Sequence, residues 1–230
     1  MNRWSVAALL TLAAGSTVSA DVILSNYPPT NDTNTTAGVS STRRKAMSFS
    51  MPAGPTYDIT SITLRLQGYT SPSDVAILEI RDHTGSTTAP GTTVVGTFVA
   101  PASSNTAAGD FVFMPSGAVT LLPGTSYWIC LYAGDATNTF DWRGSSPAIV
   151  PTGIATYGGQ SLFSTTSGST WTTSTTINTF SIDGVPSGAS GACCLSSGAA
   201  NCVITSAAGC AAQGGTYQGD GSTCATANCP

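Results

Sequence analysis

Six of the seven cysteines of this chain lie close together near its C-terminus, behind an N-terminal segment with the features of a secretory signal. Thiols stay paired only in oxidising compartments, and a small module with few large apolar residues needs disulfides for a stable fold. We therefore expect a disulfide-rich module over residues 191–230. Its disulfide-forming residues are expected to be Cys193, Cys194, Cys202, Cys210, Cys224 and Cys229.

Residues 1–20 predict a signal peptide that is removed on export. Arg3 supplies a basic start, Val6 to Ala14 an apolar stretch, and Val18-Ser19-Ala20 a small-residue cleavage site. The apolar stretch is shorter than the roughly 20 residues that cross a bilayer, and no later segment is long and apolar enough. We expect a mature chain from Asp21 that has no transmembrane segment and is secreted or held at the cell surface.

Charged residues make up only 8% of the chain, against roughly 25% in an average globular domain. Removal of Arg3 with the signal peptide leaves 6 basic and 11 acidic residues, a net charge of about −5. An acidic protein of this kind is not expected to bind nucleic acid. Hydrophobic residues make up 41%, enough for a core, so disorder is expected only in linkers.

The apolar residues of 21–186 recur at every second position in short runs, which is typical of β-strands. In the segment Ile62–Leu66, the apolar side chains fall on one face, and Thr63 and Arg65 fall on the other. Turn sequences such as Pro90-Gly91 separate these runs, and no helical period lies between them. Because a parallel sheet would need crossover helices, the sequence predicts an all-β fold with an antiparallel, jelly-roll-like β-sandwich.

The segment Tyr127–Tyr132 is apolar at odd and even positions alike, which predicts a central strand covered on both faces. Cys130 lies in this strand, far in sequence from the other cysteines. We interpret Cys130 as a buried free thiol that packs as a small hydrophobic group. The alternative is a catalytic or intermolecular thiol.

A series of short motifs runs in order through the β-rich region. They are Asp21–Asn26, Ala46–Phe49, Ile62–Leu66, Pro90-Gly91, Val95–Phe98, Leu122–Trp128, Phe140–Trp142, Gly168–Trp171 and Phe180–Ile182. Together they resemble the choice-of-anchor R family of exported bacterial proteins, over about residues 21–183. The resemblance implies a shared β domain joined to a variable C-terminal anchor, and it carries over no catalytic activity.

The C-terminal region lacks the apolar sorting helix with a basic end found in the commonest members, which leaves covalent anchoring unsupported. Its cysteine order, from Gly191-Ala-Cys-Cys194 to Asn228-Cys-Pro230, resembles a short module at the ends of exported planctomycete-type proteins. Residues 187–190 are expected to be a linker. Spacing does not choose among the disulfide pairings, except that the adjacent Cys193 and Cys194 are not expected to pair with each other.

A short helix is expected within this module, over Ala207–Gln213. Ser206 would cap its start and Gly214 would end it. Zinc is the alternative explanation of a cysteine cluster, but the spacing lacks paired C-x₂-C motifs and the module has no histidine. We expect no metal and no cofactor.

The sequence offers little support for an enzyme, and we assign no catalytic residue. His83 is the only histidine and lies in a turn-like sequence, while Glu79 is the only glutamate and is best explained by an ion pair or an outward-facing position. Glycoside hydrolysis needs two facing carboxylates. Aspartates could in principle supply them, but most of the candidates lie in turn-like contexts: Asp58, Asp74, Asp110, Asp135 and Asp141.

Trp142, Arg143 and Trp171 are the candidate ligand-binding residues. Exposed tryptophans could stack on the apolar face of a sugar, while Arg143 or Asp141 bonds its hydroxyls. The alternative, which we favour, is that both indoles fill the ends of the sandwich. Tyr157 is a third aromatic candidate.

Arg43-Arg44-Lys45 is the only basic run in the chain. It could contact an anionic envelope polymer, but we favour a solvated strand entrance or a charge guard at a sheet edge. Two sequences, Asn31-Asp-Thr33 and Asn34-Thr-Thr36, match N-glycosylation acceptors.

These features predict a non-enzymatic, exported cell-surface, envelope or matrix protein with a structural or adhesive role. An envelope or extracellular polysaccharide is the expected partner. The alternative is a carbohydrate-binding module that uses exposed aromatic residues, and the third hypothesis is a hydrolase with an aspartate-based site.

Overall fold

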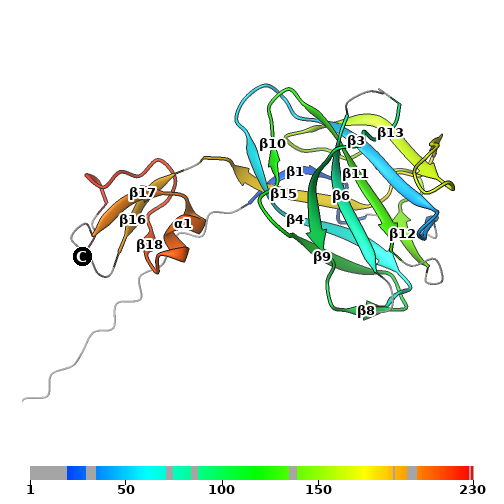
Figure 1. The fold of residues 1–230 in the computed structure, drawn as a ribbon, viewed down its shortest axis with the longest axis horizontal. Coiled ribbons are helices and arrows are strands. Elements are labelled where there is room, and N and C mark those ends of the chain that lie inside the picture. Colours follow the sequence, from blue (N-terminus) through cyan, green and yellow to red (C-terminus); the bar gives the residue numbers. More distant parts are fainter. Residues whose placement is uncertain are drawn as a thin grey trace, which may run out of the picture. The chain divides into compact units, whose positions relative to one another are not determined.

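The computed structural model describes residues 20–29, 35–70, 75–83, 88–134, 139–188, 190–195, 201–227 and 229. These residues form two compact units that divide between Ser187 and Gly188, inside the linker expected from the sequence (Figure 1). Residues 1–19 of the predicted signal peptide lie outside the described residues, and so do Asn31, Asn34, Asp74 and Asp135.

The β domain has two layers of antiparallel strands. The first, which we call the β4 layer, contains β1 (Asp21–Ser25), β15 (Phe180–Pro186), β4 (Tyr57–Gln67) and β9 (Gly109–Pro115). Two further strands, β10 (Thr120–Leu121) and β12 (Phe140–Gly144), also pair with β4, and β2 (Thr35–Val39) pairs with β12. The second, the β11 layer, contains β7 (Val94–Val99), β6 (Ala76–Asp82), β11 (Ser126–Ala133), β3 (Arg44–Ser50), β13 (Thr156–Ser164) and β14 (Thr172–Thr173). A separate pair is formed by β5 (Tyr69–Thr70) and β8 (Ser104–Asn105).

Strand β9 joins the two layers. Its first part pairs with β4, where Phe113 lies opposite Ile62, and its last residues pair with β7, where Met114 lies opposite Val99. The domain is therefore one large antiparallel sheet that curls into a sandwich-like fold. The all-β antiparallel class expected from the sequence is confirmed.

The core fills the space between the layers, and strand alternation explains which residues enter it. On β4, Ile62, Leu64 and Leu66 are completely buried, whereas Thr63 and Arg65 between them are partly exposed. Burial of each such aliphatic side chain contributes roughly 1.5–3 kcal/mol. The alternation expected over Ile62–Leu66 is confirmed.

Strand β11 is covered on both faces, as its sequence predicts. Tyr127, Ile129 and Leu131 belong to the main core. On the opposite face, a second group that we call the outer cluster consists of Ala46, Trp128, Cys130 and Leu162. Cys130 is a buried free thiol that packs as a small apolar group, and burial raises its pKa far above the usual range, which disfavours the thiolate.

The C-terminal module is held by three disulfides, which pair Cys193 with Cys210, Cys194 with Cys229, and Cys202 with Cys224. The expected assignment of all six cysteines to disulfides is confirmed, and the adjacent pair bonds to two different partners. The module also contains β16 (Gly191–Cys194), β17 (Cys202–Thr205), α1 (Ala207–Ala212) and β18 (Thr216–Tyr217). Three disulfides indicate an oxidising environment.

Helix α1 begins where the sequence predicts and ends at Ala212, one residue earlier than expected. The Ser206 hydroxyl accepts a hydrogen bond from the backbone N–H of Gly209 at 3.1 Å, and Gly214 adopts a positive φ of 65° just after the helix. Among the described residues, no helix combines the length and the apolar character needed to cross a membrane.

Candidate binding site

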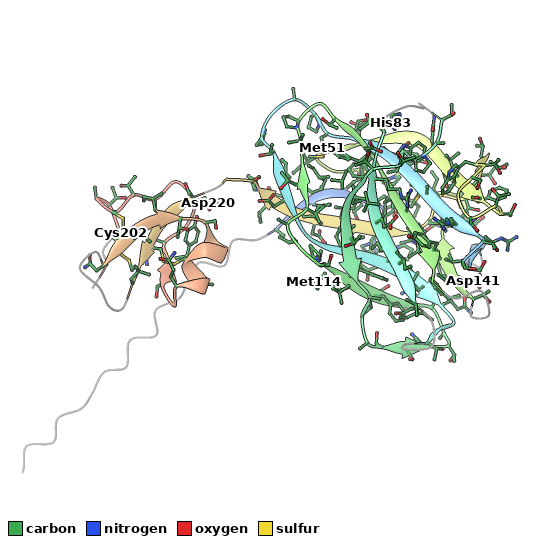
Figure 2. The ribbon with its side chains drawn as sticks, in the orientation of Figure 1. Met51, His83, Met114, Asp141, Cys202 and Asp220 are labelled. Carbon is green, nitrogen blue, oxygen red and sulfur yellow. A yellow bond between two sulfur atoms is a disulfide. The ribbon has the colours of Figure 1, made fainter. Side chains whose placement is uncertain are left out.

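A pocket of about 610 Å³ opens beside β2 and β12 in the β domain. Ligand pockets in proteins typically measure roughly 300–1,000 Å³. Strand β12 lies between β2 and the end of β4, so three segments far apart in sequence meet here. Figure 2 shows Asp141, which lines the pocket, well apart from His83.

The pocket lining is mainly polar. Hydroxyl groups come from Ser40, Thr42, Thr106, Thr139 and Thr165. Gln67 adds an amide, Arg43 and Asp141 add charged groups, and Val39 and Phe140 add apolar surface. A lining of hydroxyls and an amide with some apolar surface suits a ligand that is itself rich in hydroxyl groups.

Gly38 leaves space between the two charged groups. A Cβ atom at this position would lie 3.2 Å from Nη1 of Arg43 and 3.6 Å from Oδ1 of Asp141. Within the part of the chain that the structure describes, the Arg43 guanidinium and the Asp141 carboxylate form no ion pair with each other. Both groups therefore remain available to a ligand.

Arg143 contacts the pocket lining through Gln67. It is buried, and its Nη1 donates a hydrogen bond to Oε1 of Gln67 at 2.8 Å. The amide nitrogen of Gln67 is then left to donate to a ligand acceptor. Arg143, a candidate for direct ligand contact, does not line the pocket and instead positions Gln67, which does.

Lys45 lies near the same charged groups. Its side chain is buried, with the ammonium 5.1 Å from the centre of the Phe163 ring. Its pKa is lowered from 10.5 to about 8, mainly by burial and in part by the positive charge of Arg43, while the Asp141 carboxylate partly opposes both effects. Lys45 is therefore within electrostatic reach of both charged pocket residues.

We predict that the free energy of unfolding rises with pH between about pH 8 and pH 10. Burial of the charged Lys45 ammonium destabilises the folded chain, and this cost is fully present below about pH 8. Above that pH the folded chain loses the proton while the unfolded chain still holds it, so the cost is relieved. The rise should be at most about 3 kcal/mol. Urea unfolding at about pH 7 and about pH 9.5 measures this rise in the free energy of unfolding. The upper pH lies below the range in which most tyrosine hydroxyls ionise.

The matched variant Lys45→Met should be more stable than the wild type at neutral pH. Its free energy of unfolding should not show the rise between about pH 8 and pH 10. Because Lys45 is the only lysine in the chain, selective carbon-13 labelling of lysine also gives a single side-chain signal. That signal should titrate near pH 8. Titration at the usual lysine value of about 10.4 would contradict the buried position.

The basic run Arg43–Lys45 is solvated only in part, because Arg43, just before β3, is exposed, whereas Arg44 is half-buried and Lys45 is buried. The guanidinium of Arg44 lies 4.0 Å from the centre of the Tyr132 ring, on the face of β3 opposite to Lys45. Alternation along the strand explains the split, because neighbouring side chains point to opposite faces. Only Arg43 of the three lines the pocket.

Trp142 is placed for packing, the role that we favoured, and not for stacking on a ligand. Its indole is completely buried in the main core, where Nε1 donates to the backbone oxygen of Thr179 at 2.9 Å and the ring meets Phe180 edge to face. Trp171 is partly buried against the outer cluster. The two indoles lie in different packing clusters and form no common platform, which agrees with the packing role that we favoured for Trp142.

Glu79 and His83 both contact other side chains of the β domain. Glu79 accepts hydrogen bonds from Nε of Arg81 and from the Tyr132 hydroxyl, both at 2.8 Å, so the ion pair expected for it is confirmed. His83 stacks on Trp128 with 5.5 Å between ring centres. Its Nδ1 is buried and has no hydrogen-bond partner among the described residues.

The described residues contain no group of three or more His, Cys, Asp or Glu side chains that could hold a metal ion. Comparison with known proteins found no family model that matches the chain. The same comparison found no curated protein with significant similarity to it.

Proposed function

We propose that this chain is a non-enzymatic protein of the cell surface, envelope or extracellular matrix, and that its β domain adheres to a polysaccharide through the pocket beside β2 and β12. The observation that carries the proposal is the pocket lining, in which hydroxyls and the Gln67 amide surround the unpaired Arg43 and Asp141 side chains. Sugars present many hydroxyls that can bond to such groups.

Export through the predicted signal peptide 1–20 is part of the proposal. The three disulfides support it, because they require an oxidising compartment. The low charge content supports it too, since a surface rich in Ser and Thr suits exchange of hydrogen bonds with a hydrated matrix. We also propose that the β domain is a member of the choice-of-anchor R family, on the motifs within 21–183.

The number of carboxylates in the pocket favours a binding role over a hydrolytic one. Within the described lining of the pocket, Asp141 supplies the single carboxylate. Hydrolysis of a glycosidic bond ordinarily uses two carboxyl groups on either side of the bond. Glu79, the only glutamate, is held by Arg81 and Tyr132.

We predict that Gly38→Val weakens polysaccharide binding by at least about tenfold. This is the effect expected from the loss of at least one well-placed hydrogen bond. The new side chain would stand between Arg43 and Asp141 and leave both charges in place. Valine suits a strand, so the fold should be retained. Pull-down on a panel of envelope and extracellular polysaccharides measures the loss.

Gly117→Val is the matched control, because a Cβ atom at Gly117 meets no neighbour within 4 Å and Gly117 does not line the pocket. This variant should bind like the wild type. Equal retention of Gly38→Val and wild type would exclude the pocket as the binding site. Failure of the wild type to bind any polysaccharide in the panel would contradict the proposed function.

A further inference from the structure

The charges around the pocket are positive on balance, although the chain as a whole carries a formal charge of −4. Arg43 and Asp141 line the pocket, and Lys45 lies within electrostatic reach of both. Two cationic groups thus accompany one carboxylate. A neutral sugar would need no such excess of positive charge, whereas an anionic group would be attracted by it.

The Arg43 guanidinium is held out by an ordered turn between β2 and β3. The Ser40 hydroxyl accepts a hydrogen bond from the Arg43 backbone N–H at 3.0 Å, and the Ser40 N–H donates to the Arg43 carbonyl at 2.9 Å. These two bonds fix the backbone from which the exposed side chain extends. A guanidinium presents paired N–H donors whose spacing matches the two oxygens of a carboxylate.

We propose that the pocket binds the carboxylate of an acidic sugar residue of the uronate type, paired with the guanidinium of Arg43, while Asp141 and Gln67 bond the sugar hydroxyls. This inference rests on the proposed polysaccharide-binding function and names the class of sugar. Asp141 can only accept from hydroxyl donors when ionised, and the free amide nitrogen of Gln67 can only donate. The site thereby offers a different kind of group to the carboxylate and to the hydroxyls of one ring.

Lys45 provides a reporter of this binding. The groups that face its ammonium are Arg43, Asp141 and the Phe163 ring, and its neighbour on β11 is the apolar Leu131. An anion bound at Arg43 would offset the charge that lowers the Lys45 pKa. Binding of the acidic sugar should therefore raise the pKa of Lys45, with uptake of protons near pH 8, and affinity should fall as pH rises through this range.

The test compares each of two polyuronates, polygalacturonate and alginate, with its methyl-esterified form, which keeps the sugar backbone and removes the charge. At least one polyuronate should bind the full chain about tenfold to a hundredfold more tightly than its ester. Arg43→Gln should abolish this preference. Arg65→Gln should keep it, because it removes the same charge from a surface ion pair with Asp110 that does not line the pocket.

Titration of the single carbon-13 lysine signal, with and without the bound polyuronate, gives the second readout. An upward shift of its midpoint in the wild type that is absent in Arg43→Gln would support the inference. Equal affinity for acid and ester, or no binding of either polyuronate by a protein that retains other polysaccharides, would overturn the inference and leave the proposed function standing. Loss of all polysaccharide binding would overturn both.

Discussion

Reduction of the three disulfides is expected to unfold the C-terminal module and to leave the β domain folded. Among the described residues of the module, the buried side chains larger than glycine are Ala192, Cys193, Cys194 and Cys210. The interior is thus made largely of sulfur. The loops that the disulfides close have separations of 17, 22 and 35 residues, and each closure contributes about 3–4 kcal/mol in the chain-entropy model. Three such losses exceed what a unit of this size can withstand.

Two-dimensional NMR of the full chain before and after reduction measures this effect. Amide signals of the module should collapse to the range of unfolded peptides, while those of the β domain, whose Cys130 is already a free thiol, should stay dispersed. Cys193→Ser with Cys210→Ser should destabilise the module more than Cys202→Ser with Cys224→Ser, since the first pair is completely buried and the second is only partly so. Dispersed module signals after complete reduction would show that the module has another source of stability.

Replacement of Trp142 by alanine is expected to lower the free energy of unfolding of the β domain by about 3–5 kcal/mol. The indole is completely buried, packs against Phe180, and donates its N–H to Thr179, so its removal leaves a large cavity in the main core. The loss is a large part of the 5–15 kcal/mol typical of a domain. Urea unfolding followed by far-UV circular dichroism measures it.

Trp171→Ala is the matched comparison, because its indole is only partly buried against the outer cluster. It should cost clearly less stability than Trp142→Ala. A Trp142→Ala protein with nearly wild-type stability and reduced polysaccharide binding would restore the ligand-stacking role for this residue.

The strands could be predicted from the sequence because each depends on local alternation. The pattern of β4 distinguishes Leu64 from Arg65 without knowledge of any partner strand. The favoured packing role of Trp142 is also supported by local alternation. Phe140, two residues earlier on β12, is also buried, and both rings point to the same face, whereas Asp141 and Arg143 alternate with them.

The pocket could not be predicted in this way. Gly38, Gln67 and Asp141 come together only through the pairing of β12 with β2 on one side and β4 on the other. The register of these strands is not encoded in a local motif. The disulfide pairing was likewise open, because it depends on how β16 and α1 bring Cys193 and Cys210 together.

The most direct test of the pocket beside β2 and β12 as the binding site is an NMR titration of the isotope-labelled full chain. Backbone amide shifts are mapped as an oligosaccharide from a polysaccharide that the chain binds is added. The largest changes are expected at Gly38, Arg43, Gln67 and Asp141, which line the pocket. Saturable binding whose largest changes fall instead around Trp171 or in the cysteine module would contradict this expectation.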